Sequence, residues 1–502
     1  MAFSDDQAAA YDRIAGQLAQ AGIDLAEAAV DSAVVAQPAV TAVLGRAGSG
    51  KTRLLAALVK ALSAAGVEAV SADWEGRKKR DRRTFAVLAP TNKAASVLRG
   101  HGVPATTIHR ILYTPVYDPE YEKVAAWLAG EGGRPEIEGL TEAALDRAHS
   151  FFAAQPSIPG ALAAAGLRGS DFITGWKRRD APLDLGLVDE ASMLEERQMQ
   201  DLREIFPTLV MFGDPAQLAP VGQSERMVFD ELPAERQLRL SRIHRQAEGN
   251  PILDLAHALS DDDLGFEAFE RLVERAAASD PRVVLARRVD ADLMARSPVL
   301  VWRNATRIRL IRAFRAAHDA PEDGLLPGEP LICDGLELPL KHRKRRLDLE
   351  AKGLIKGAPA IYLGPGRRQG FSRIHLQGSE DPRLNVASIV AIERPGEEEP
   401  FIPFAASMGA RFLHGAAVTI HKAQGSQWPA VQVFAPDLYA AARSGRSEAG
   451  IPLWKRLAYV AITRAEEQLV WVTRYALARP SAPLGIEDLP DPAATLTLSG
   501  SA

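Results

Sequence analysis

A glycine-rich octapeptide constrains the fold of this chain more than any other part of its sequence. Residues 45–52 read Gly-Arg-Ala-Gly-Ser-Gly-Lys-Thr, which matches the pattern GxxxxGK[ST]. The apolar, β-prone segment 40–44 precedes it, and an apolar helical segment, 52–64, follows it. A loop in this setting binds phosphate groups with its backbone N–H groups and with the N-terminus of the following helix. The octapeptide therefore predicts a phosphate site at the edge of a sheet.

Short apolar segments that alternate with helical ones predict the sheets themselves. Strands are expected at 40–44, 85–89, 185–188 and 209–212, and a second set at 299–302, 431–434 and 469–472. Strands that alternate with helices form parallel sheets with crossover helices. The predicted fold class is therefore α/β, with two such domains in tandem and a first helix over 5–21.

Two stretches of the chain fit neither sheet. Residues 113–180 look helical and loop-like, with a break at 130–135. Residues 331–403 contain short strands at 360–363, 372–376 and 387–391, separated by Gly and Pro, which indicates a small β-domain. The predicted boundaries are 1–112 and 181–235 for the first α/β domain, 113–180 for its insertion, 236–330 and 404–480 for the second, 331–403 for the β-domain and 481–502 for a flexible tail.

Composition narrows the class of protein. Of the 502 residues 47% are hydrophobic and 25% are charged, which is typical of globular proteins rather than of disordered or fibrous ones. The single cysteine, Cys333, excludes an intrachain disulfide and a cysteine-based zinc site and favours a reducing compartment. We see neither a signal peptide nor the ~20 apolar residues that a bilayer span needs. The sequence therefore predicts a cytoplasmic protein without membrane association.

The charge of the chain is unevenly distributed. The formal net charge is −4, but basic residues gather at 77–83, 303–315 and 341–346. Local basic stripes fit a groove that follows a nucleic-acid backbone. Each cluster alone is more often a solvated surface.

Polar residues follow two of the predicted strands at the edge where the glycine-rich loop lies. Asp189 and Glu190 come directly after strand 185–188, and Gln217 lies in the turn after strand 209–212. In phosphate-loop proteins an aspartate in this position holds Mg²⁺, and a neighbouring glutamine or glutamate orients the attacking water. A glutamate here indicates hydrolysis by water rather than transfer to an acceptor. The alternatives are a surface acidic pair and a plain turn.

Two arginines are candidates for neutralising the charge of a γ-phosphate from a facing domain. Arg245 lies in Ile-His-Arg-Gln at 243–246, and Arg464 lies in Tyr-Val-Ala-Ile-Thr-Arg-Ala at 459–465. Arginines in this role contribute strongly to phosphoryl transfer. Either one taken alone is more often a surface residue in an ion pair.

Taken in order, these segments resemble the motif series of superfamily 1 helicases. The Thr-Ile-His-Lys-Ala-Gln-Gly form of residues 419–425 resembles the RecD-like, Dda-like branch, superfamily 1B. The segments that carry the resemblance are 3–7 (glutamine motif), 45–52 (I), 89–95 (Ia), 106–110 (the next DNA-side motif), 189–193 (II), 213–221 (III), 244–246 (IV), 418–426 (V) and 459–465 (VI). The sequence departs from the family pattern at Ala219, Gln427 and Ile311, none of which belongs to the hydrolytic set.

The resemblance implies two RecA-like domains with ATP and Mg²⁺ in the cleft between them, and an SH3-like insertion in the second domain. The catalytic residues that it implies are Lys51, Asp189, Glu190, Gln217, Arg245 and Arg464. The implied ATP contacts are Gln7, Gly45, Ala47, Gly48, Ser49, Gly50, Lys51, Thr52 and Gly425, and the implied Mg²⁺ ligands are Thr52 and Asp189. For Gln7 the alternative is a helix-capping box with Ser4.

The resemblance also implies a nucleic-acid track. Its candidate contacts to single-stranded DNA are Thr91, Asn92, His109, Thr419 and His421, with Trp302 and Tyr113 as candidates for base stacking. The insertion 113–180 lies where relatives carry a strand-separating pin, and the cluster 341–346 is a candidate contact to duplex or displaced strand.

The implied activity is an ATP-dependent DNA helicase. It would move 5′→3′ on single-stranded DNA, act at junctions between single and double strands, and be a monomer. The alternatives are a DNA-stimulated translocase that displaces proteins without unwinding, an RNA helicase, and a scaffolding subunit with a degenerate ATPase.

Overall fold

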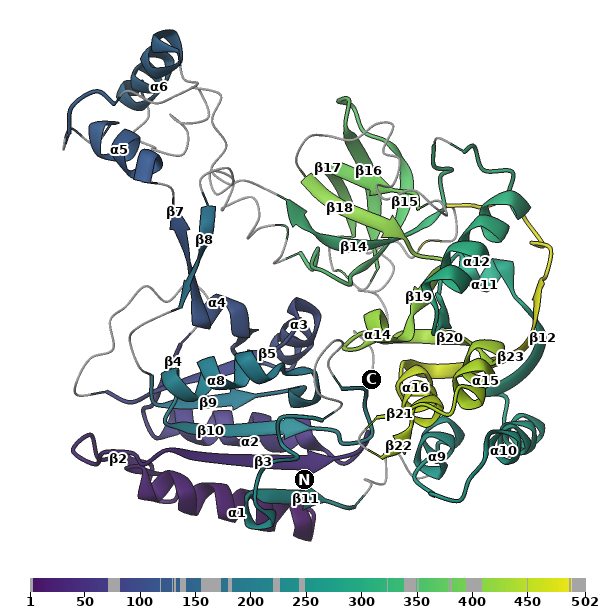
Figure 1. Ribbon diagram of the computed structural model, residues 1–502, viewed down its shortest axis with the longest axis horizontal. Helices are drawn as coiled ribbons and strands as arrows, with labels where there is room; N and C mark the ends of the chain where they lie inside the picture. Colours follow the sequence, from purple (N-terminus) through teal and green to yellow (C-terminus); the bar gives the residue numbers. More distant parts are fainter. Residues whose placement is uncertain are drawn as a thin grey trace, which may run out of the picture.

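The protein is described here from a computed structural model (Figure 1). It describes the 502-residue chain except for residues 1–2, 71–81, 118, 129, 131, 136–140, 155–172, 179–182, 220–225, 243–248, 323, 338–348, 350–351, 378, 380–381, 394–408, 449, 487–488 and 490–502.

The first domain is built on a parallel sheet of seven strands. The strand order is β11-β3-β10-β9-β5-β4, and β6 also pairs with β5. The strands are β3 (Ala39–Gly45), β4 (Glu68–Ala69), β5 (Thr84–Ala89), β6 (Ala105–Thr107), β9 (Leu185–Val188), β10 (Thr208–Gly213) and β11 (Gln237–Leu240). Every residue of β5, β9 and β10 is buried, as expected of central strands covered on both faces. The four strands predicted for this half are confirmed.

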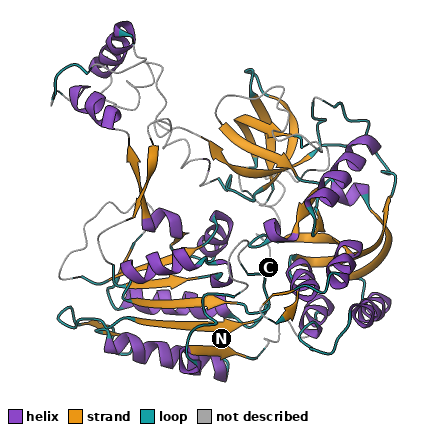
Figure 2. Cartoon of the chain, in the orientation of Figure 1, coloured by secondary structure: helices purple, strands orange, loops and turns teal. Residues whose placement is uncertain are grey.

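Helices cover both faces of this sheet (Figure 2). The helices α1 (Asp5–Gln20), α2 (Lys51–Ala64) and α3 (Asn92–Gly100) share one apolar core with the sheet, and α4 (Ile108–Leu112) and α8 (Glu196–Ile205) share another. Along β3, Val43 packs in the first core while Ala42 and Leu44 pack in the second, which follows the period of two along a strand. The short elements of this domain are β1 (Ile23–Asp24), β2 (Ala29–Val30), η2 (Ala191–Met193) and η3 (Ala234–Arg236).

The second domain repeats this plan with a parallel sheet of five strands in the order β12-β23-β20-β13-β19. Its strands are β12 (Val283–Val289), β13 (Val299–Val301), β19 (Ala417–Thr419), β20 (Trp428–Phe434) and β23 (Ala465–Leu477). One face of the sheet is covered by the helices α9 (Pro251–Ala258), α10 (Phe266–Ser279), α15 (Ala435–Arg443) and α16 (Leu453–Ile462). The other face is covered by α11 (Ala291–Met294) and α12 (Asn304–Ala317). The helix α14 (Ile420–Ala423) follows β19, and β21 (Ser447–Glu448) and β22 (Ile451–Pro452) form a small hairpin. The prediction of two tandem RecA-like α/β domains is confirmed.

A closed five-stranded barrel is inserted into the second domain. Its strands are β14 (Pro330–Glu337), β15 (Pro359–Pro365), β16 (Phe371–Leu376), β17 (Arg383–Ala391) and β18 (Gly409–His414). The three strands predicted here are confirmed. The barrel also takes β18, which the sequence-based boundaries placed in the second α/β domain, because β14 needs β18 as its antiparallel partner to close the barrel. The likeness to an SH3 domain stays a prediction.

An arm projects from the first domain (Figure 1). Its stalk is an antiparallel ribbon of β7 (Tyr113–Tyr117) and β8 (Ile173–Arg178), and its far end carries α5 (Pro119–Leu128) and α6 (Glu142–Ala154). The helices agree with the helical character predicted for 113–180. The ribbon was not predicted, because its two strands lie more than fifty residues apart and neither has a neighbouring partner in the sequence.

The start of the C-terminal tail is tied to the second domain. The backbone N–H of Ser481 donates to the Asp292 carboxylate at 3.0 and 3.1 Å, and Arg296 Nη2 donates to the carbonyl of Gly485 at 2.8 Å. The partners are Asp292 of α11 and Arg296, two residues after that helix. The flexible tail over 481–502 stays a prediction. Among the helices that are described, none combines the length and the hydropathy that a bilayer span requires.

Candidate functional site

The glycine-rich loop joins β3 to α2 at the C-terminal edge of the first sheet. Gly48 and Gly50 adopt φ values of +82° and +81°, a region that side chains with a Cβ rarely adopt. A Cβ at Gly45 would lie 2.3 Å from Ser49 Oγ. The loop is thus closed so tightly that these three positions call for glycine, and it lies at the N-terminus of α2, which favours an anion.

Two side chains of the loop fit a phosphate ligand. Lys51 Nζ donates to the carbonyl oxygens of Gly45 at 2.5 Å and Arg46 at 3.1 Å, which holds the ammonium group against the loop. The Ser49 hydroxyl is buried and has no hydrogen-bond partner among the described residues. Because buried polar groups are normally hydrogen-bonded, we expect an oxygen of a bound ligand to be the partner of this hydroxyl.

Gln7 ties α1 to this loop. Its Oε1 accepts from the backbone N–H of Ser4 at 3.3 Å, which is the capping-box contact, and its Nε2 donates to the carbonyl of Ser49 at 3.0 Å. The side chain is fully buried. The capping alternative for Gln7 is therefore confirmed, and an additional contact to adenine stays a prediction.

Glu190, the second residue of the acidic pair after β9, lies beside Gln217. Gln217 Nε2 donates to Glu190 Oε2 at 3.1 Å, and Ser192 Oγ donates to Gln217 Oε1 at 3.3 Å. Glu190 holds its backbone at φ +51° and ψ +41°, so a residue with a Cβ occupies the left-handed region. Burial, together with the Glu190 carboxylate, raises the pKa of Asp189 to about 7. A cation bound at Asp189 would stabilise its charged carboxylate and so lower this pKa.

The second domain reaches this site through α16 and α9. Tyr459 donates its hydroxyl to Asp214 Oδ2 at 2.6 Å and accepts from the backbone N–H of Ala47 at 2.8 Å. Burial and the Asp214 carboxylate raise the pKa of this tyrosine well above its ordinary value. His257 Nε2 lies 3.2 Å from the carbonyl of Ala47. The loop is therefore contacted directly by the other domain.

Sequence reasoning missed three of these contact residues. The sequence pattern indicates Tyr459 only as the first residue of segment 459–465, and it indicates no role for Arg456, one helical turn earlier. Arg456 Nη1 donates to the carbonyls of Pro215, at 3.3 Å, and Gln217. His257 belongs to α9, which carries no motif. Arg456 and Tyr459 are three residues apart, so on a helix they lie on the same face. This spacing is the sequence signal that could have indicated their shared contact with the first domain.

The structure holds Arg464 within its own domain. Its guanidinium is buried and donates to the carbonyls of Val460 and Ser426, both at 3.1 Å, and to Thr463 Oγ1 at 3.1 Å. Burial lowers its pKa, an effect that Glu190 opposes. The hydrogen bonds of its guanidinium therefore go to residues of its own domain. Arg245 lies outside the described residues.

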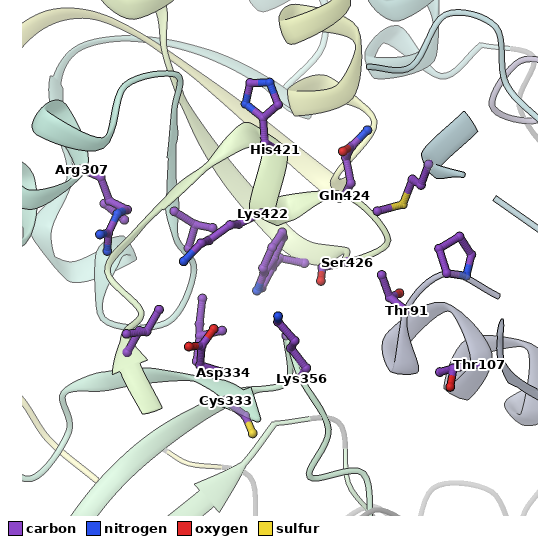
Figure 3. A pocket seen from close by; sticks show the side chains of 18 of the residues that line it. Thr91, Thr107, Arg307, Cys333, Asp334, Lys356, His421, Lys422, Gln424 and Ser426 are labelled. Carbon is purple, nitrogen blue, oxygen red and sulfur yellow. The ribbon is translucent and has the colours of Figure 1, made fainter. Parts of the chain in front are cut away.

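A cavity of about 430 Å³ lies where the two α/β domains meet the barrel. It brings together three of the predicted nucleic-acid contacts, Thr91, His109 and His421, with Lys356 of the barrel segment and Lys422 of α14. In Figure 3 the side chains of Lys356, Lys422 and Asp334 face one another across the cavity, while the ring of His421 points away from them. Burial lowers the pKa values of His109 and His421, so the lysines rather than the histidines supply positive charge here.

The other predicted contacts are placed differently. Thr419 precedes α14 as its N-cap and is not among the residues that line the cavity, and the side chain of Asn92 lies outside the description. Gly425 was expected to contact ATP. A Cβ at that position would lie 3.3 Å from Thr91 Oγ1, so Gly425 lies close to the start of α3. Its contact with ATP stays a prediction.

Trp302 does not line the cavity. It is partly buried against the core of the second sheet, and its backbone N–H donates to Asp437 at 3.1 Å. Trp428, which was not predicted, does line the cavity but is only 3% exposed. The side chain of Tyr113 lies outside the description. Trp428 is therefore covered, and base stacking on Trp302 or Tyr113 stays a prediction.

The basic clusters contribute less free charge than their sequences suggest. Three arginines of the 303–315 cluster are paired: Arg303 with Asp437, Arg307 with Glu393 and Arg315 with Glu329. Residues 77–81 of the 77–83 cluster, and the whole of the 341–346 cluster, lie outside the described residues. Among the described residues, the cations that line the cavity are Arg110, Arg307, Lys356 and Lys422, of which Arg307 is paired with Glu393.

Comparison with known proteins identifies the family. The family model described as an AAA domain matches residues 26–279, just over half of the chain. The chain belongs to this family. A second model, the UvrD-like helicase C-terminal domain, matches residues 414–472. With the motif order, these matches place the chain in superfamily 1, in the RecD-like branch.

This RecD-like AAA-domain chain also matches individual proteins. It is 24% identical over 301 residues to the ATP-dependent RecD2 DNA helicase of Deinococcus radiodurans. The matched region covers 57% of this chain and 36% of that protein. The chain thus spans about a third of the length of the curated relative it matches. Solved structures with a similar fold include Pif1 helicase from Bacteroides with ADP-AlF3 and single-stranded DNA (15% identity, 99% of this chain and 97% of that one, TM-score 0.45) and Pif1 helicase from Candida albicans (14%, 94% and 95%, TM-score 0.44).

Proposed function

We propose that the protein is an ATP-dependent DNA helicase, in which ATP hydrolysis between the two α/β domains moves single-stranded DNA through the cavity beside the barrel. The observation that carries this proposal is that the same short segments reach both places. Glu190 faces Gln217 at the nucleotide side, and Met193, three residues later, lines the cavity. Gln424 also lines the cavity, and its Nε2 donates to the carbonyl of Leu218 at 3.3 Å.

The nucleotide side has the groups that ATP hydrolysis needs. The loop amides and Lys51 bind the phosphates, and Thr52 and Asp189 would hold Mg²⁺, which neutralises phosphate charge when bound. Mg²⁺ commonly uses one or two protein ligands beside phosphate oxygens and water. The described residues accordingly need no cluster of three or more acidic or histidine side chains, and none is found among them. Glu190, oriented by Gln217, polarises the attacking water.

The nucleic-acid side binds a backbone rather than a base sequence. Lys356 and Lys422 supply charge that attracts phosphates, and Thr91 and Thr107 line the same cavity with hydroxyl groups. The cavity walls come from both domains and the barrel segment, so a change in their separation changes the grip on the strand. This is the differential contact by which a nucleotide can shift the equilibrium between two arrangements of a protein.

The test is ATP hydrolysis by the full chain with and without single-stranded DNA. We expect strong stimulation by DNA, and we expect Glu190→Gln to abolish turnover while nucleotide binding survives. Thr141→Ala, on the arm, is a matched control that should leave turnover unchanged. Hydrolysis that DNA leaves unaffected, or no hydrolysis at all, contradicts the proposal.

Polarity and unwinding are tested on partial duplexes with a 5′ or a 3′ single-stranded tail. The proposal expects ATP-dependent strand release from the 5′-tailed duplex only. Stimulation by DNA without strand release would identify a translocase that does not unwind. Stronger stimulation by single-stranded RNA of the same sequence would identify RNA as the substrate.

A further inference from the structure

Arg456 of α16 crosses from the second domain to the first. Its Nη1 donates to the carbonyl oxygens of Gln217 and, at 3.3 Å, Pro215, while its Nε donates to the carbonyl of Glu448 at 3.2 Å. The residue is 3% exposed, and burial lowers the pKa of its guanidinium. Burying a cation costs free energy unless its donors are bonded. Here two of the bonds go to one turn of the other domain.

That turn carries the side chain that orients Glu190. The carbonyls of Pro215 and Gln217 lie on either side of Ala216, so the guanidinium holds both ends of the turn. From this turn Gln217 Nε2 donates to the Glu190 carboxylate at 3.1 Å. Reacting groups must be held within a fraction of an ångström of their productive geometry. The position of Arg456 therefore affects Glu190 without any contact between the two.

We propose that Arg456 is a positioning residue, which sets the Gln217–Glu190 pair for hydrolysis when the two α/β domains are in contact. The inference rests on the proposed ATP hydrolysis and adds the residue through which domain contact reaches the water-polarising carboxylate. Arg464 differs, since its hydrogen bonds to Val460, Ser426 and Thr463 stay within the second domain.

The neighbouring residue offers a matched control. Lys455 lies on the same helix, is 4% exposed, and donates Nζ to the carbonyls of Asp261 at 2.6 Å and Asp262 at 3.0 Å. Both of these carbonyls belong to the second domain. Arg456→Met and Lys455→Met each remove a buried cation bonded to carbonyls, but only the first removes a contact with the turn of Gln217.

The experiment measures steady-state ATP hydrolysis on single-stranded DNA for these variants and for Arg456→Lys, each in the wild-type and the Gln217→Ala background. We expect Arg456→Met to lower kcat ~10–100-fold, as for other groups that orient a catalytic side chain. The KM for ATP should stay within about threefold, because the loop contacts are intact. The kcat of Arg456→Lys should lie between those of Arg456→Met and the wild type. The kcat of Lys455→Met should match that of the wild type.

The Gln217→Ala background gives the decisive comparison. In that background, Arg456→Met should lower kcat by less than about a further twofold. The reason is that the Gln217 side chain, through which Arg456 acts, is already absent. A full additional loss in that background, or equal losses for Arg456→Met and Lys455→Met, would overturn the inference. If thermal melting shows that Arg456→Met is unfolded, the same comparison is made with Arg456→Lys.

The failure of the inference can be told apart from the failure of the proposed function. A wild-type protein without ATP hydrolysis contradicts both. An active wild type and an Arg456→Met variant with unchanged hydrolysis contradict the inference alone.

Discussion

Glu190 holds its backbone in the left-handed region although it carries a Cβ. This conformation costs about 1–2 kcal/mol for a residue other than glycine. Such strain persists where the surrounding structure imposes it, and it gathers at functional sites. At Glu190 it accompanies a carboxylate that Gln217 orients and that helps to raise the pKa of Asp189. Stability and function are therefore opposed at this one residue.

Glu190→Gly should raise the free energy of unfolding by ~1 kcal/mol and abolish ATP turnover, because it removes both the strain and the carboxylate next to Asp189. Denaturant unfolding and an ATPase assay measure the two effects. Glu195→Gly is the control, since Glu195 has an ordinary φ of −80° and should gain nothing. A less stable Glu190→Gly variant would contradict the strain argument.

His421 gives a pH dependence with a definite sign. Burial, followed by the charge of Arg446, lowers its pKa in the folded protein. The unfolded chain therefore binds the proton more readily, so this contribution to stability is present above pH ~6.5 and is lost as the pH falls below it. His421→Gln should lose less unfolding free energy than the wild type between pH 7 and pH 5. Equal losses in the two proteins would show that His421 is not the group responsible.

At the scale of elements, local patterns were predictable and distant pairings were not. The strands β9 and β10 are apolar runs beside turn residues, so their sequences indicate them directly. The β7–β8 ribbon is held by pairing between Tyr113 and Arg178, a relation that no local pattern encodes. Likewise, Lys51 and Glu190 follow from motifs, whereas Arg456 matters because of carbonyls contributed by another domain.

The root of the barrel depends on a buried carboxylate. Glu329 is fully buried, lies 3.1 Å from Arg315 Nη1 of α12 and 2.8 Å from His414 Nε2 of β18, and accepts from the backbone N–H of Leu326 at 2.7 Å. These contacts fix β14 and β18 against the second domain at the point where the barrel begins and ends.

Glu329→Gln should lower the free energy of unfolding by ~3–5 kcal/mol, because it leaves the Arg315 cation buried without its carboxylate. Denaturant unfolding measures the loss. The matched control is Arg134→Gln on the arm, where Arg134 forms an exposed pair with Asp146 at 2.9 Å and should change stability by less than ~1 kcal/mol. Similar effects of both substitutions would contradict this account of the barrel root.

At the scale of the whole molecule, the two sites share their walls. Tyr459 of the second domain contacts Asp214 and Ala47 at the nucleotide side, and Gly425 of the same domain packs against Thr91 at the cavity. A movement that separates the domains must therefore change both sites together. The sequence placed the motifs in order, but it could not show that α16 and α14 carry these contacts, since each depends on how two domains meet.

The central claim, that one pair of domains couples a nucleotide site to a nucleic-acid site, is tested most directly by equilibrium binding. The measurement is the Kd of the full chain for single-stranded DNA with no nucleotide, with ADP and with a non-hydrolysable ATP analogue. We expect the analogue to change this Kd at least ~5-fold, and DNA to change the Kd of the analogue by the same factor, because coupling between two sites is reciprocal. A Kd for DNA that is identical in all three conditions would contradict the account.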